Sequence, residues 1–197
     1  VFHQLLNEGH LNGVVMTREP GGTPLGKVFR QLILEQRTGQ SIQARTELLL
    51  YAADRAQHVE EMVKPHLEQG FLVLCDRYTD STIAYQGYGR ELDLSLIEQL
   101  NQIATDGLES ELTFWLNLEV EVGLARTQKR GEADRIEQTN LAFHRRVQRG
   151  FETLAAAHPH RIAPINASLS EAAVSQSIQT ILEQQLIQWY RPHSTNL

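Results

Sequence analysis

The stretch Phe71-Leu72-Val73-Leu74-Cys75 runs directly into Asp76-Arg77-Tyr78-Thr79, and this transition decides the fold. Five apolar residues between Gly70 and Asp76 are too few for a helix. Because they lack polar alternation, they predict a parallel strand buried on both faces. Open α/β sheets bind their ligands at the carboxyl ends of such strands. Asp76 and Arg77 stand at that end, where they suit a metal-bound or hydroxyl group and a phosphate. The alternative is a structural ion pair that ends the strand.

The composition of the 197-residue chain indicates one domain, which we expect over residues 1–190, with a disordered tail over 191–197. Apolar residues make up 41% of the chain, enough for a sizeable core, and no apolar run is long enough to span a membrane. The net charge of −6 argues against wholesale nucleic-acid binding, which requires a basic face. The single cysteine, Cys75, excludes a disulfide framework and favours a cytoplasmic location.

Strand-like and helix-like stretches alternate along the chain, which predicts parallel α/β layers. The apolar runs predict strands over 14–16, 71–75, 112–118 and 161–167. Helical periodicity predicts helices over 27–35, 44–64, 80–87, 94–103, 119–127, 140–157 and 170–190. We expect the second of these helices to stop at Pro65, and its buried stripe to consist of Leu48, Ala52, Ala56, Val59 and Val63. In the helix over 94–103, we expect Leu96, Leu100 and Ile103 to face inward.

A glycine-rich loop follows the first predicted strand. Gly21-x-x-x-x-Gly26-Lys27 fits the first seven positions of a phosphate-binding P-loop and stands between a strand and a helix. The next residue, Val28, lacks the hydroxyl that holds magnesium, and Pro24 removes one of the amides that such a loop points at phosphates. A true P-loop here is therefore the weaker interpretation.

Two pairs of residues suggest a nucleotide site. Arg18 follows its strand as Arg77 follows the central strand, so the two could clamp one phosphate, each charge-assisted bond contributing about 1.5–3 kcal/mol. Tyr51 and Arg55 lie one helical turn apart, so a ring that stacks and a guanidinium that donates would face one nucleobase. The alternative for Tyr51 and Arg55 is a cation–π pair on the helix surface.

A basic stretch over 126–135 is polar, contains a glycine and has little to bury. It predicts a mobile flap, and the alternative is a solvated helix end.

Taken together, these motifs resemble those of bacterial thymidylate kinases, in the P-loop nucleoside-monophosphate kinase group. The matches run in the family's order over nearly the whole chain: 17–23, Tyr51 with Arg55, 76–78, 81–89 and 131–137. The resemblance implies a three-layer P-loop NTPase-like fold with a mostly parallel sheet flanked by helices. It also implies a homodimer and transfer of the γ-phosphoryl group of ATP to dTMP with Mg²⁺, which gives dTDP for dTTP synthesis. One alternative is that dUMP is the acceptor. Another is a non-catalytic remnant that binds nucleotides or forms dimers.

The resemblance also assigns roles in binding dTMP. Tyr51 corresponds to the residue that stacks on thymine, Arg55 to the donor to its 4-oxo group, and Thr82 to the residue at its N3 edge. Tyr85 corresponds to the aromatic residue under the sugar, and Gln86 belongs to the same substrate-binding set.

Further roles concern the phosphates. Arg18 and Arg77 correspond to the pair that grips the dTMP phosphate, and Asp76 to the acid near the phosphates and Mg²⁺. The stretch over about 126–137 corresponds to the lid, in which Arg130 and Arg135 would reach the transferred phosphoryl group. Asn166, Ala167 and Ser168 would lie on the adenine side.

The family's Gly-rich Walker loop, with the strand before it, has no match within these residues. In the family that strand is central and lies beside the strand that ends at Cys75. We therefore expect that an N-terminal segment is missing from the chain as written, by loss or by a misplaced start. On this interpretation residues 1–197 alone would be unstable and would show no dTMP-dependent ADP release.

Overall fold

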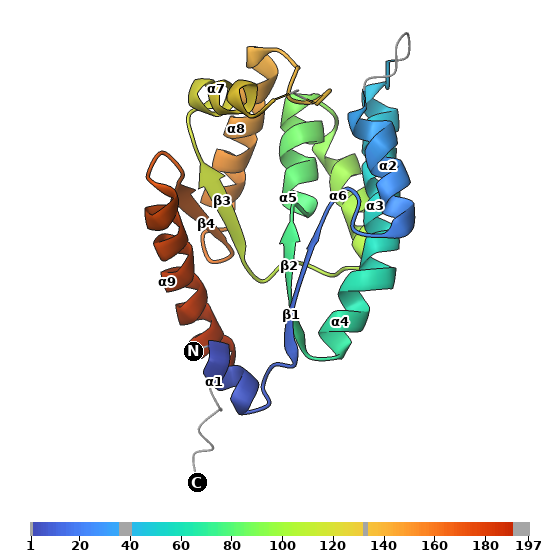
Figure 1. Ribbon diagram of the computed structural model, residues 1–197. Coiled ribbons are helices and arrows are strands. Elements are labelled where there is room, and N and C mark those ends of the chain that lie inside the picture. The colour runs from blue at the N-terminus through green and yellow to red at the C-terminus, as the bar shows by residue number, and fades with distance from the viewer. Residues whose placement is uncertain (1, 36–40, 132–133, 191–197) are drawn as a thin grey trace.

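The strands of the described residues form two parallel pairs at the centre of the protein. The computed structural model describes residues 2–35, 41–131 and 134–190 (Figure 1). Strand β1 (Gly13–Arg18) pairs with β2 (Phe71–Asp76), and β3 (Thr113–Asn117) pairs with β4 (Ile162–Asn166). The predicted parallel α/β arrangement is confirmed. Across the described residues no backbone ladder joins the two pairs, so the expected sheet is present there as two halves.

The prediction that the central strand is buried on both faces is wrong for the described structure. Leu74 of β2 keeps 38% of its surface exposed, and Met16, its register partner on β1, keeps 80%. Helix α4 (Lys64–Glu68) packs against β2, and the cluster of Leu5, Leu11 and Leu186 covers Leu72. A continuous apolar run therefore marks the strand correctly but does not show which of its faces is covered.

The helices that follow β1 are α2 (Pro24–Leu34), α3 (Ala44–His58), a π-helical turn η1 (Val59–Val63) and α4 (Lys64–Glu68). The helical path continues past Pro65, contrary to the prediction that it stops there. Pro65 lies in the first turn of α4, directly after the π turn, in which the Lys64 N–H donates to the Val59 carbonyl five residues back. The α-helical hydrogen-bond pattern is therefore already interrupted where Pro65 lacks an N–H.

After β2 the chain forms α5 (Thr79–Thr82), the π-helix η2 (Ile83–Gly89) and α6 (Leu94–Thr105). Asp93 caps α6 by accepting hydrogen bonds from the first-turn amides. The inward face of α6 differs from the prediction, because Ile97 and Asn101 are buried, whereas Ile103 is 76% exposed. Helix α6 packs on α3, and Asn101 there binds a buried arginine, so a polar contact decides which face turns inward.

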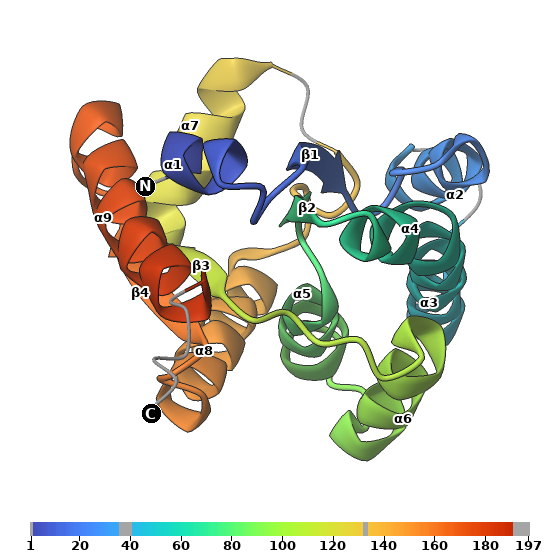
Figure 2. The same ribbon diagram turned by 90° about the horizontal axis from the view of Figure 1, so that it is seen from below.

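The C-terminal half contains α7 (Val120–Arg130), α8 (Leu141–Ala157) and α9 (Glu171–Tyr190). Figure 2 shows α8 and α9 on one side of the strands and α2, α3, α4 and α6 on the other. Helix α8 packs closely on η2. A Cβ on Gly150 would lie 2.9 Å from the Tyr88 ring, and one on Gly89 would lie 2.6 Å from the Phe143 ring, so both positions require glycine. No helix among the described residues is both long and apolar enough to cross a membrane.

Candidate active site

A cavity of about 230 Å³ lies at the carboxyl end of β2. Seven of the predicted site residues line it: Tyr51, Arg55, Asp76, Arg77, Thr82, Tyr85 and Gln86. They come from α3, the end of β2, α5 and η2, so the fold gathers residues that are up to 35 positions apart in the sequence. The remaining lining residues had no individual role assigned from the sequence: Glu19, Pro20, Arg30, Leu34, Ser81, Asp134, Ile136, Glu137 and His144.

The Tyr51–Arg55 pair lies where helical spacing predicts, with both side chains at the cavity. Burial raises the pKa of the Tyr51 hydroxyl well above its usual range, so the ring is neutral. Arg55 is only 2% exposed, and its guanidinium lies 5.4 Å from the centre of the Tyr78 ring. Its Nε donates to Glu19 (2.8 Å) and its Nη1 to Asn101 (2.7 Å). Its Nη2 group has no acceptor among the described residues and remains available to a ligand.

Glu19 is the centre of a buried polar network that the sequence pattern did not predict. Its second oxygen lies 2.8 Å from His58 Nδ1, and His58 Nε2 lies 2.7 Å from the Thr17 hydroxyl. His58 is fully buried. The signal was present in α3, where Glu47, Asp54, Arg55 and His58 recur at helical spacing beside the stripe that we expected to be buried.

Glu19, His58 and Cys75 also bring one potential metal-ligand atom each within 4.8 Å of the others. Their present partners fit a metal poorly. Arg55 already supplies the counter-charge to Glu19, and burial raises the pKa of the Cys75 thiol far above neutrality. The cluster is therefore best described as an ion-pair network.

Arg77 has an unusual backbone conformation, with φ of 70°, directly after β2. A non-glycine residue in this left-handed region is strained, and such strain is frequent at functional sites. Its guanidinium lies 5.0 Å from the centre of the Tyr85 ring, at the cavity. The turn thus directs a cation into the site.

Arg18 does not join Arg77 in the cavity, contrary to the prediction. It lies in register with Asp76 at the same end of the strands, but its side chain is exposed and does not line the cavity. Alternation along β1 sends Arg18 and the next residue, Glu19, to different sides. Arg30 of α2 lines the cavity instead, and its Nη1 donates to the Pro20 carbonyl (3.0 Å).

The predicted lid differs from the structure at both of its ends. Residues 126–130 continue α7, so the flap does not begin at Arg126, and the side chain of Arg130 lies outside the described part. Arg135 does not reach over the cavity in this structure. It donates from Nε to the Ile33 carbonyl (2.8 Å) and forms an ion pair with the buried Glu47. The next residue, Ile136, is buried against the core, which holds this segment in place.

The loop that mimics a P-loop uses its amides within the protein. Gly21 N–H donates to Asp54 (3.0 Å) and Gly26 N–H to the Thr23 hydroxyl (2.9 Å), and both bonds are buried. The P-loop interpretation of this segment is therefore contradicted. Burial raises the pKa of Asp54 to about 6, although the bond from Gly21 opposes that rise.

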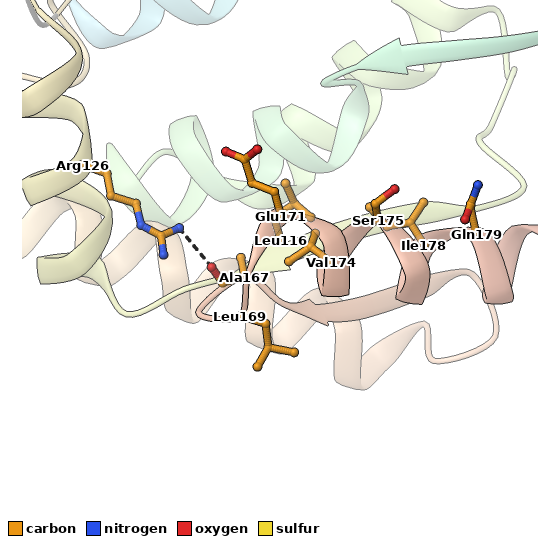
Figure 3. Close-up of a pocket in the computed structure, with 9 residues that line it drawn as sticks. All are labelled: Leu116, Arg126, Ala167, Leu169, Glu171, Val174, Ser175, Ile178 and Gln179. Carbon is orange, nitrogen blue, oxygen red and sulfur yellow. Dashed lines mark hydrogen bonds between the residues drawn. The ribbon is translucent and has the colours of Figure 1, made fainter.

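A second cavity, of about 390 Å³, lies between the end of β3, the start of α9 and α7 (Figure 3). Its wall is largely apolar, with Leu116 and Ile178, and Arg126 donates to the Ala167 carbonyl at its edge (3.0 Å). Of the three residues predicted for an adenine, Ala167 lines this cavity. Asn166 Oδ1 instead accepts bonds from the backbone (3.0 Å) and hydroxyl (2.6 Å) of Ser168, so those two side chains hold the turn.

Comparison with known proteins gives a consistent result. A sequence model of the family "Thymidylate kinase" matches residues 1–178. The thymidylate kinase of Cyanothece sp. is 60% identical over 182 residues, covering 90% of this chain and 78% of that protein. The thymidylate kinase of Nostoc punctiforme is 62% identical over 172 residues, with 86% and 81% covered. The crystal structure of thymidylate kinase from Ehrlichia chaffeensis matches with a TM-score of 0.70 at 33% identity, over 92% of this chain and 86% of that chain.

Proposed function

Because the chain belongs to the thymidylate kinase family, whose members are phosphotransferases, we propose that it transfers the γ-phosphoryl group of ATP to dTMP, giving dTDP for dTTP synthesis. The fold is the P-loop NTPase-like α/β fold. The observation that carries the proposal is one cavity with a stacking ring and a buried guanidinium on α3, and two further arginines, one directly after β2 and one on α2. The expectation that the protein also needs the family's first strand and Walker loop stays a prediction.

In this proposal the pyrimidine lies against the Tyr51 ring. The free Nη2 group of Arg55 donates to the 4-oxo group, because its other nitrogens are held by Glu19 and Asn101. Thr82, 3% exposed, meets the N3 edge of the base, and Tyr85 lies under the sugar.

Arg77 and Arg30 would hold the phosphate of dTMP. Phosphoryl transfer depends on positioning and on stabilising the charge that spreads over the equatorial oxygens, which guanidinium groups do well. Asp76 lines the same cavity with an exposed carboxylate, the kind of ligand that Mg²⁺ prefers, so it would hold the ion that accompanies ATP. Bound there, Mg²⁺ would neutralise phosphate charge. Arg130 remains our candidate for the lid arginine.

For the donor, we propose that the adenine lies at the second cavity. Its apolar wall suits a base, and the Ala167 turn borders it.

We also propose that the protein forms a homodimer in the cytoplasm. The support for the dimer is α6, which exposes Leu96 (42%) and Ile103 (76%) beside its contact with α3. Apolar side chains in such a row are suited to an interface between copies.

A coupled ADP-release assay tests the function, with dTMP, dUMP and dCMP as acceptors, on a protein in which a family-like strand and Walker loop precede Val1. We expect this protein to show turnover that requires dTMP, with a loss of at least tenfold in kcat/KM for Arg30→Ala or Arg77→Ala. Arg145→Ala is the matched control, because that arginine is exposed and pairs only with Glu121 among the described residues. Titration calorimetry provides a readout of the acceptor side alone. Absence of dTMP binding would overturn the proposal.

A further inference from the structure

Glu47 is a fully buried carboxylate on α3, one turn before Tyr51. Its Oε1 accepts from Gln86 Nε2 (3.0 Å) and from Arg90 Nε (3.1 Å). Its Oε2 accepts from Arg90 Nη2 (3.1 Å) and from Arg135. One side chain thus joins α3, η2 and the segment after α7.

The carboxylate is ionised at neutral pH. Burial alone would raise its pKa, but hydrogen bonds from Arg90, Gln86 and Arg135 outweigh burial, and the pKa of Glu47 lies below its ordinary value. An ionised carboxylate only accepts hydrogen bonds. Gln86 must therefore turn its NH₂ group toward Glu47, since the opposite orientation would set two acceptors against each other.

This constraint determines what Gln86 offers to a ligand. The side chain is 2% exposed and lines the cavity, and no described residue donates to its Oε1. With the NH₂ group held by Glu47, the amide presents a carbonyl acceptor. Thr82, one turn earlier on the same wall, has a hydroxyl that rotates, so it accepts from a donor or donates to an acceptor equally well. Gln86, in its fixed orientation, can discriminate where Thr82 cannot.

We propose that Glu47 is a specificity-determining positioning residue, which fixes the Gln86 amide as an acceptor and so favours bases with a ring N3–H over cytosine bases. Thymine and uracil carry a hydrogen on N3, whereas N3 of cytosine is an acceptor and would face the Gln86 oxygen. A site that leaves a buried polar group unpaired rejects the wrong ligand strongly. This inference rests on the proposed binding of dTMP in the cavity, and it extends that proposal to a residue that need not touch the nucleotide.

The test compares the affinities of the full chain for dTMP and dCMP by titration calorimetry. In Glu47→Gln, the residue at position 47 can donate as well as accept, so the Gln86 amide can turn over. We expect the ratio of the dTMP affinity to the dCMP affinity to fall about tenfold. Arg90→Lys is the matched control, because it weakens the ion pair with Glu47 but leaves the Glu47–Gln86 bond in place, so the ratio should stay within about twofold.

A second arm separates selectivity from stability. In a Gln86→Leu background, Glu47→Gln should leave the ratio unchanged, because its effect passes through the amide. If Glu47→Gln does not fold, Glu47→Asp keeps the charge but draws it back by one methylene, and the same fall is expected. An equal loss of affinity for both nucleotides, or an unchanged ratio, would overturn the inference. If the wild-type chain binds neither nucleotide, the proposed function has failed instead.

Discussion

Replacing Glu19 by Gln removes the charge from the centre of the buried network and nearly preserves its shape. The Glu19 side chain is 2% exposed and lies 2.8 Å from both Arg55 Nε and His58 Nδ1. A neutral amide can still accept one bond through its oxygen, and its NH₂ group then faces the other partner. The Arg55 guanidinium, itself 2% exposed, loses its only counter-charge among its described partners.

Removing one partner of a buried ion pair costs about 3–5 kcal/mol, because the remaining charge stays desolvated. Retaining one of the two hydrogen bonds recovers about 1 kcal/mol. We therefore expect Glu19→Gln to lower the free energy of unfolding by about 2–4 kcal/mol, a large part of the roughly 5–15 kcal/mol that stabilises a domain. Because the same carboxylate orients Arg55, the affinity for dTMP should fall as well.

Urea unfolding followed by circular dichroism measures the first effect and titration calorimetry the second. The matched control is Glu121→Gln, whose carboxylate pairs with Arg145 but is 53% exposed, so the stability of this variant should change far less. The double variant Glu19→Gln/Arg55→Met should recover much of the lost stability, since no unpaired charge remains. Equal costs for the two Gln variants would refute the reasoning.

Three further predictions concern other parts of the chain. At position 77, where φ is 70°, the Arg77→Gly variant should be more stable than the Arg77→Ala variant by about 1 kcal/mol in urea unfolding. Both variants should lose affinity for the dTMP phosphate, and a more stable Arg77→Ala variant would argue against backbone strain. Because the pKa of Asp54 is raised to about 6 in the folded state, the native state holds this proton more tightly than the unfolded chain does. The stability contributed by protonated Asp54 should therefore be lost between about pH 4 and pH 6, by roughly 2–3 kcal/mol, and Asp54→Asn should remove that decline in unfolding curves taken across this range. Ile103→Glu, at a position 76% exposed, should convert the proposed dimer to a monomer in light scattering without changing the circular dichroism spectrum, whereas Leu169→Glu, exposed outside α6, should not; an unchanged dimer would exclude this face of α6.

The local features of this protein follow from its sequence. The apolar run before Asp76 makes β2, and the alternation of such runs with helical periodicity makes the strands parallel. Helical spacing alone places Tyr51 and Arg55 at one cavity, because residues four apart share a face. These features depend on neighbours within a few positions, so a pattern is sufficient to predict them.

Contacts between distant segments decided the rest. The buried face of α3 is polar because Glu19 pairs with Arg55 across 36 positions and Arg135 pairs with Glu47 across 88. Arg30, and not Arg18, reaches the cavity because strand alternation and the packing of α2 set their directions. A charged residue is predicted to lie on the surface unless its partner is known, because only the partner's charge offsets the free-energy cost of burying it. Only the tertiary structure supplies that partner. For this reason the sequence predicted seven residues that line the first cavity, but not the buried network that supports them.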